Sequence, residues 1–186
     1  MAIEAVSRVL ALGAYDGVLR QVVRLLKFRD RQDLAGFLGR QLALLARTAE
    51  PTAGQLDGVW RFSATGQGAE VGHPRAVWVP VPSHRRRVRQ RGYDHVRLLT
   101  RAAARAGRAP WMPVLARRVE TPPLYRLSRP EREAALVGAF VATRPAPERV
   151  LLVDDLLTTG ATAIAAAKAL KAAGTQEITL IVIARA

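Results

Sequence analysis

The sequence predicts an α/β fold in which a mainly parallel sheet is flanked by helices. Three observations carry this prediction. Val150–Val153 and Ile178–Ile183 are almost wholly apolar runs, which is the pattern of strands covered on both faces. The segment from Ala161 to Ala173 between them is helix-like and is closed by Gly174. Ala76–Val81 is a further strand candidate, and strands that alternate with helices are typical of parallel sheets.

The other elements follow from apolar spacing and from helix and turn signals. The predicted elements are two helices within residues 15–47, a short strand at 58–63 in a loop-rich stretch, a helix at 93–106, an extended segment at 111–119, a short helix from Ser128 to Val137 and a strand at 140–142. We expect a small N-terminal helical or hood region at residues 1–75 and a core domain at residues 76–186.

Composition sets limits on the class of protein. The 186 residues carry a formal net charge of +14, most of it from arginine. Such a charge favours phosphorylated metabolites, nucleic acid or acidic membrane, although the codon bias of a GC-rich genome explains the same composition. The absence of cysteine excludes disulfides and a thiolate nucleophile. Because no apolar run is long enough to cross a bilayer, we expect no membrane span and a cytoplasmic protein.

The strongest functional signal is the segment from Val150 to Thr162. It combines an apolar strand, the acid pair Asp154 and Asp155, a small-residue turn and a helix start. Ligands of open α/β sheets bind at the carboxyl ends of strands. Backbone N–H groups of such a turn converge on one anion, and Gly160 allows a close backbone approach. The alternative is an ordinary strand-to-helix turn whose acids cap the helix.

Two carboxylates would repel an anion bound at the neighbouring turn. The two features are compatible if the ligand carries hydroxyl groups between its charged ends. Asp154 and Asp155 would then accept hydrogen bonds from a sugar diol, as an acidic residue does for ribose in dinucleotide folds. The same two carboxylates would help to hold Mg²⁺, directly or through water. The sequence therefore predicts a phosphorylated sugar as the ligand.

These residues resemble the signature of the type I phosphoribosyltransferases. A second resemblance, to the ComF family of phosphoribosyltransferase-like proteins linked to DNA uptake in competent bacteria, spans residues 15–186. Its matching motifs, in order, are Tyr15-Asp16-Gly17, Leu26-Lys27-Phe28, Val79-Pro80-Val81-Pro82, Arg91-Gly92-Tyr93-Asp94-His95, Thr121, Arg132 to Phe140 and the turn at 158–162. This chain lacks the four-cysteine zinc module of many members, and His95 stands where the family often has Gln.

The resemblance implies a type I phosphoribosyltransferase fold and 5-phosphoribosyl pyrophosphate as ligand, with Mg²⁺ as cofactor. It implies that Asp154 and Asp155 bind the ribose hydroxyls and that the turn holds the 5-phosphate. The turn residues are Thr158, Thr159, Gly160, Ala161 and Thr162. Enzymes for 6-oxopurines carry Asp where this chain has Thr158, so the turn looks more like that of the adenine-type enzymes. The phosphoribosyl group would pass to a nitrogen acceptor, a nucleobase or an amine, that the sequence does not identify.

The loop after the strand at 76–81 is the predicted pyrophosphate site. Ser83, His84 and Arg85 follow Pro82, and the resemblance implies a tight turn there, with a strained or cis peptide as one way to form it. The basic stretch that continues to Arg91 has three interpretations: a lid that clamps pyrophosphate, a nucleic-acid surface or a solvated loop. Within the lid interpretation, Arg91 is the lid arginine. Catalytic roles are assigned to Arg91 and Asp155.

A second function class remains open at this point. A non-catalytic protein of DNA uptake would bind single-stranded DNA with its basic surface and keep the phosphoribosyl pyrophosphate site as a sensor or relic. The low aromatic content, 5%, disfavours binding by base stacking. A homodimer is a further expectation for either class.

Overall fold

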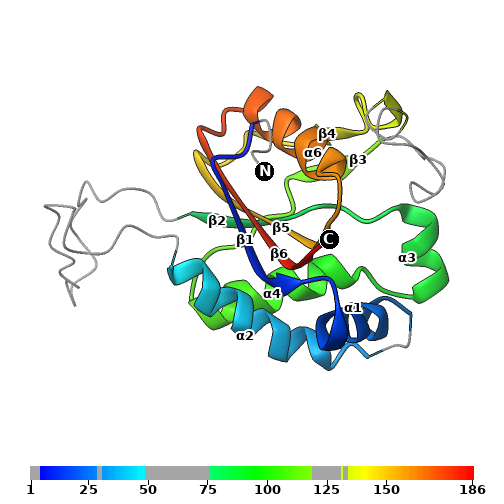
Figure 1. Ribbon diagram of the computed structural model, residues 1–186. Helices are drawn as coiled ribbons and strands as arrows, with labels where there is room; N and C mark the ends of the chain where they lie inside the picture. The colour runs from blue at the N-terminus through cyan, green and yellow to red at the C-terminus, as the bar shows by residue number, and fades with distance from the viewer. Residues whose placement is uncertain (1–4, 29–30, 49–75, 119–130, 132–133) are drawn as a thin grey trace, which may run out of the picture.

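The computed structural model describes residues 5–28, 31–48, 76–118, 131 and 134–186. Its centre is a four-stranded sheet with the order β1-β6-β5-β2 and with every pair of strands parallel (Figure 1). The strands are β1 (Arg8–Ala14), β2 (Val77–Pro80), β5 (Arg149–Leu157) and β6 (Glu177–Arg185). Because the strands are parallel, their carboxyl ends meet at one edge of the sheet.

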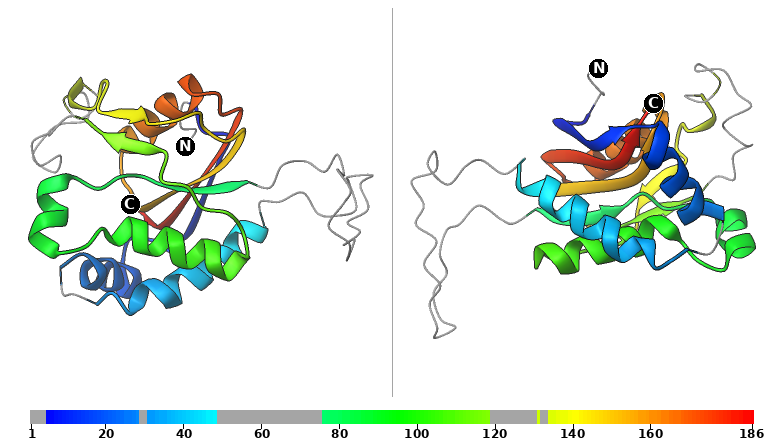
Figure 2. Two further views of the ribbon diagram at one scale, coloured as in Figure 1. Left: turned by 180° about the vertical axis from the view of Figure 1, so that it is seen from behind. Right: turned by 60° about the horizontal axis from the view of Figure 1, so that its bottom comes forward.

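Helices cover both faces of this sheet (Figures 1 and 2). The helices α1 (Gly17–Phe28), α2 (Leu34–Arg47) and α4 (His95–Gly107) lie on one face, and α6 (Ala161–Ala172) lies on the other. In β5, Val150 and Leu152 pack into the core on the α6 side, while Leu151 and Val153 pack into the core on the α4 side. This alternation explains why the strand is apolar at each position from Val150 to Val153.

Two smaller elements flank the edge at which the strands end. The short helix α3 (Arg85–Arg91) follows β2, and a two-stranded antiparallel ribbon pairs β3 (Leu115–Arg117) with β4 (Phe140–Ala142). The basic stretch expected as a loop is therefore a short helix, with His84 accepting a hydrogen bond from the Arg86 amide at its N-cap. All peptide bonds between described residues are trans, so the turn after Pro80 forms without a cis bond.

The predicted α/β class with a mainly parallel sheet is confirmed. The predicted helices and strands of the described residues are present within a few residues of their expected bounds, and β1 and α3 are two further elements that were not predicted. The strand expected at 58–63 lies outside the described residues, as does the start of the helix expected at 128–137. None of the described helices has the length and apolar character that a bilayer crossing demands.

The N-terminal residues are part of the main sheet. Strand β1 pairs with β6 through Arg8↔Thr179 to Ala14↔Arg185, and α2 packs closely on α4. The sheet thus contains strands from both sides of the boundary expected at residue 75, and the division into a hood region and a core stays a prediction.

Candidate functional site

A cavity of about 900 Å³ lies at the carboxyl ends of β2 and β5. Its walls come from the turn between β5 and α6, the loop between β2 and α3, the start of α4 and the end of α1. Of the predicted site residues, ten line it: Ser83, His84, Arg91, Asp154, Asp155, Thr158, Thr159, Gly160, Ala161 and Thr162. Arg85 is not among the lining residues of this cavity.

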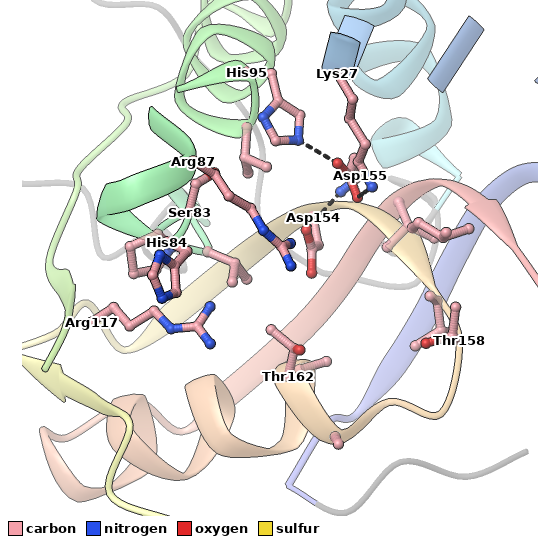
Figure 3. A pocket seen from close by; sticks show the side chains of 18 of the residues that line it. Lys27, Ser83, His84, Arg87, His95, Arg117, Asp154, Asp155, Thr158 and Thr162 are labelled. Carbon is pink, nitrogen blue, oxygen red and sulfur yellow. Dashed lines mark hydrogen bonds and ion pairs between the residues drawn. The ribbon is translucent and has the colours of Figure 1, made fainter. Parts of the chain in front are cut away.

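The two acids belong to β5, which continues past them to Leu157. Neighbouring residues of a strand point to opposite faces, so the two carboxylates separate. Figure 3 shows Asp154 directed toward Arg87 and Thr162, and Asp155 directed toward His95 and Lys27. Asp154 is partly accessible, whereas Asp155 is only 5% exposed. The acid pair therefore offers one carboxylate to the open cavity.

Both oxygens of Asp155 already have partners. Lys27 Nζ lies 2.8 Å from Oδ1, and Nε2 of His95, itself 4% exposed, forms a short contact with Oδ2 (Figure 3). Burial alone would raise the pKa of Asp155, but the charge of Lys27 and the hydrogen bond from His95 hold it below its ordinary value. Asp155 is therefore ionised and paired inside the protein.

Arg91 completes this cluster from the end of α3. Its Nη1 lies 3.1 Å from His95 Nδ1, and its guanidinium lies 4.9 Å from the ring centroid of Phe28. Because a guanidinium can only donate, Nδ1 of His95 must accept, and the ring proton is then on Nε2, facing Asp155. Arg91 is thus held against α1 and α4 at the edge of the cavity, and its role as a lid arginine stays a prediction.

Asp154 has a different electrostatic environment. One of its oxygens accepts the Asp155 amide at 2.8 Å. Burial, followed by the negative charge of Asp155, raises its pKa to about 7. Arg87 and Arg117 reach toward it from α3 and β3 (Figure 3), and burial, with the charge of Arg87, lowers the pKa of Arg117. Two cations thus point toward a carboxylate that carries a raised pKa.

The turn between β5 and α6 lines the cavity and has several backbone N–H groups without a backbone acceptor. Gly160 is its αL residue, with φ of 82°, a conformation that other residues adopt only at a cost. Among the described residues, no carbonyl accepts a backbone bond from the N–H groups of Thr158, Thr159 or Gly160. The first N–H groups of α6 likewise lack intrahelical partners, as at any helix start. These donors and the helix dipole favour an anion.

The loop after β2 is fixed by a second polar cluster. Ser83 Oγ donates to Asp94 Oδ1 at 2.8 Å, and the same oxygen caps α4 by accepting from Val96 and Arg97 at 3.1 and 3.2 Å. Asp94 therefore ties the loop to the start of α4. The prediction that Ser83 and His84 face the same cavity as the acids agrees with their positions.

Sequence reasoning missed three cavity residues with charged side chains: Lys27, Arg87 and Arg117. Lys27 was part of a matching motif but received no role. Arg87 lies within the basic stretch but was not singled out there, and Arg117 lies in a stretch without any motif. Only the parallel topology, which brings α1, α3 and β3 to the end of β5, places these cations beside the acids.

A magnesium ion fits this cavity only together with its ligand. The described residues form no group of three or more His, Cys, Asp or Glu side chains able to hold a metal. Asp155 could join a metal site only by releasing Lys27 or His95, so Asp154 is the available carboxylate. Mg²⁺ in phosphate sites commonly uses one or two carboxylates, ligand phosphates and water. Asp154 with ligand oxygens satisfies that pattern.

Comparisons with known proteins agree with this geometry. Residues 131–186, which contain the turn and β6, match the model of the phosphoribosyl transferase domain family. Competence protein F of Haemophilus influenzae is 29% identical over 96% of this chain and 73% of that protein. An adenine phosphoribosyltransferase of Kineococcus radiotolerans is 42% identical over 44% of each chain.

Among solved structures, glutamine phosphoribosylpyrophosphate amidotransferase from B. subtilis matches with a TM-score of 0.49 and 18% identity, over 86% of this chain and 30% of that one. This likeness is too distant to carry an argument. The family match, the alignment along almost the whole chain and the parallel sheet with its strand-end cavity agree with one another. The chain is similar to competence protein F along almost its whole length and to the phosphoribosyl transferase domain family in its C-terminal part, and its α/β fold with a parallel sheet agrees with that group.

Proposed function

We propose that the cavity binds 5-phosphoribosyl pyrophosphate with Mg²⁺ and that the protein transfers the phosphoribosyl group to a nitrogen acceptor. The observation that carries the proposal is the arrangement at the end of β5. An amide-lined turn, an accessible carboxylate and two arginines line one cavity of about 900 Å³, a volume ordinary for a ligand of this size. Their order matches a ligand with a phosphate, a diol and a pyrophosphate.

Each part of the ligand has a partner in this proposal. The 5-phosphate lies on the turn Thr158–Thr162, where the amides and threonine hydroxyls donate. A ribose hydroxyl donates to Asp154, and the pyrophosphate lies between Ser83, Arg87 and Arg117. Mg²⁺, when bound to Asp154 and ligand oxygens, would add positive charge at the pyrophosphate. Asp155 lies on the same strand as Asp154 but points to the opposite face. Its negative charge therefore acts on the site without contact with the ligand.

The chemistry asked of the protein is mainly electrostatic. The bond between ribose C1 and the pyrophosphate oxygen breaks, a bond from C1 to the acceptor nitrogen forms, and the proton that the acceptor nitrogen loses passes to the released pyrophosphate or to water. Positive charge develops on the sugar ring and negative charge on the leaving pyrophosphate. Arg87 and Arg117 stabilise the leaving group, and Asp154 lies near the developing positive charge.

Calorimetric titration of phosphoribosyl pyrophosphate with Mg²⁺ tests binding. Asp154→Asn removes a charge-assisted hydrogen bond, and we expect affinity to fall about 10- to 100-fold. Asp33→Asn is the matched control, since Asp33 is an exposed carboxylate paired with Arg31 away from the cavity. Equal affinity of the wild type and Asp154→Asn would refute the assignment. Release of pyrophosphate across a panel of nucleobases and amines then tests transfer.

Binding of single-stranded DNA is a second candidate function, supported by one surface feature. Four exposed arginines recur along α4 and its C-cap at helical spacing: Arg97, Arg101, Arg105 and Arg108. They form one basic stripe on a helix without acidic residues. We expect labelled single-stranded DNA to bind with an affinity that falls at least tenfold between 50 and 200 mM salt, and Arg101→Glu with Arg105→Glu to weaken it further. No binding at 50 mM salt would exclude this function.

A further inference from the structure

The outer surface of helix α2 carries exposed apolar and cationic side chains in one stripe. Phe37, Arg40, Leu44 and Arg47 recur at intervals of three and four residues, so the helical repeat places them on the same face. Phe37 is 54% exposed and Leu44 is 56% exposed, and both arginines are exposed as well. We call these four residues the α2 stripe.

The α2 stripe takes no part in packing the described fold. The other side of the helix, with buried Leu38 and Leu42, packs on α4 and into the core. Figure 1 shows α2 on the side of the molecule opposite α6, and no residue of α2 lines the cavity at the end of β5. A phenylalanine and a leucine on one exposed face therefore lie in water without contributing to the core, which is typical of a surface that meets a partner.

The charge of the α2 stripe selects the chemistry of this partner. Within the described part of the chain, Arg40 and Arg47 take part in no ion pair. The helix itself contains no acid, and Asp33 at its start is paired with Arg31. A second copy of this face would bring the same cations, and the whole chain carries +14. The partner must therefore offer negative charge at its surface and apolar groups close beneath it.

We propose that the α2 stripe binds the surface of a bilayer that contains anionic lipids. Phe37 and Leu44 enter the boundary of the acyl chains, as the apolar residues of interfacial helices do. Arg40 and Arg47 lay their apolar stems along this boundary and keep their guanidinium groups at the lipid phosphates. The cavity at the end of β5 stays open, because α2 does not line it. This inference does not depend on phosphoribosyl transfer taking place.

Two other kinds of partner fit the α2 stripe less well. A protein groove that receives a helix takes apolar side chains at successive turns, whereas here Arg40 separates Phe37 from Leu44. A nucleic-acid backbone would use the two arginines but leave both apolar side chains in water. Only the bilayer surface uses both kinds of side chain in the stripe.

Sedimentation with lipid vesicles tests the apolar part of the proposal. At about 50 mM salt we expect binding to vesicles in which about one third of the lipid is phosphatidylglycerol, and none to vesicles of phosphatidylcholine alone. Phe37→Ser with Leu44→Ser keeps the charge and should weaken binding at least tenfold, because contacts with the acyl chains are lost. Val137→Ser is the matched control, since it changes an exposed apolar side chain outside α2.

The same assay tests the cationic part. Arg40→Gln with Arg47→Gln should also weaken vesicle binding at least tenfold. Arg101→Gln with Arg105→Gln removes the same charge from α4 and should leave vesicle binding in place. All of these side chains are exposed, so thermal unfolding of the variants should match the wild type. Unchanged affinity of the α2 variants for phosphoribosyl pyrophosphate separates this test from that of the proposed function.

Three results would overturn the inference. Equal losses in the α2 and α4 arginine variants would indicate only the overall charge. Vesicle binding by the double serine variant at the level of Val137→Ser would exclude contact with the acyl chains. Absence of binding to the anionic vesicles would exclude the membrane surface, and a loss of single-stranded DNA binding in Arg40→Gln with Arg47→Gln would then assign the α2 stripe to nucleic acid.

Discussion

Asp154 and Asp155 show how strand geometry gives two identical neighbours different environments. Asp155 turns inward to Lys27 and His95, and Asp154 faces the cavity with a pKa raised to about 7. The sequence motif pointed to both acids, and both line the cavity. The motif could not show that one acid is buried and the other faces the cavity, because this depends on how far β5 extends and on side chains from α1 and α4.

The raised pKa of Asp154 predicts a pH-dependent stability. Its folded value of about 7 lies above the ordinary 3.8, so the folded protein binds this proton more tightly than the unfolded chain does. Ionisation of Asp154 therefore lowers the free energy of unfolding by its full amount above pH 7. This loss disappears below about pH 4, where the acid is protonated in both states. Asp154→Asn should raise the free energy of unfolding at pH 8 by at most about 4 kcal/mol, with a smaller gain at pH 5.

Urea unfolding at pH 5 and pH 8 measures the change in the free energy of unfolding. Asp33→Asn is the control, because it makes the same substitution at an exposed carboxylate. A gain of equal size at pH 5 and pH 8 would show that charge on Asp154 is not its cause. A stabilising variant that also loses ligand affinity would mark Asp154 as a residue kept for function at a cost in stability.

Lys27 is predicted to stabilise the fold through Asp155. Lys27→Met leaves a buried carboxylate with only His95 as a partner, and we expect a loss of about 3 kcal/mol in the free energy of unfolding. In the double variant with Asp155→Asn the charge is gone, so the combined loss should fall below the sum of the single losses by at least about 1 kcal/mol. Additive losses would show that Lys27 and Asp155 do not interact.

At the scale of elements, apolar patterns identified the strands and helices of the core, and local signals failed at two places. Strand β1 was missed because its pairing partner, β6, lies at the other end of the chain and only that pairing makes it a strand. The helix α3 was missed because its sequence is almost wholly cationic and has no apolar face with a period to detect.

The contact between α2 and α4 gives a prediction at the same scale. A Cβ added to Gly39 would lie 2.6 Å from Ala102 Cβ and 2.7 Å from the Ala103 backbone nitrogen, so Gly39→Ala should cost about 1–3 kcal/mol. Gly36, one turn earlier, has no atom within 4 Å of such a Cβ, so Gly36→Ala should stabilise the helix by about 0.5–1 kcal/mol. Thermal unfolding of both variants measures the contrast, and equal effects would contradict this packing.

At the scale of the molecule, the parallel topology assembles the site. It brings the ends of α1, β2, β3 and β5 to one edge, and so gathers Lys27, Ser83, Arg117 and Asp154 from distant parts of the chain. The motif at 150–162 located that edge from sequence alone, because its residues are contiguous. The cations could not be located in this way, since their meeting point depends on the order of strands in the sheet.

The central claim is that the turn after β5 holds a sugar phosphate while Asp154 meets the sugar. A crystal structure of the protein with phosphoribosyl pyrophosphate and Mg²⁺ tests it most directly. We predict the 5-phosphate oxygens at about 3 Å from the backbone nitrogens of Thr158–Thr162 and a ribose hydroxyl at hydrogen-bond distance from Asp154. A ligand bound with its sugar phosphate away from that turn would contradict the account.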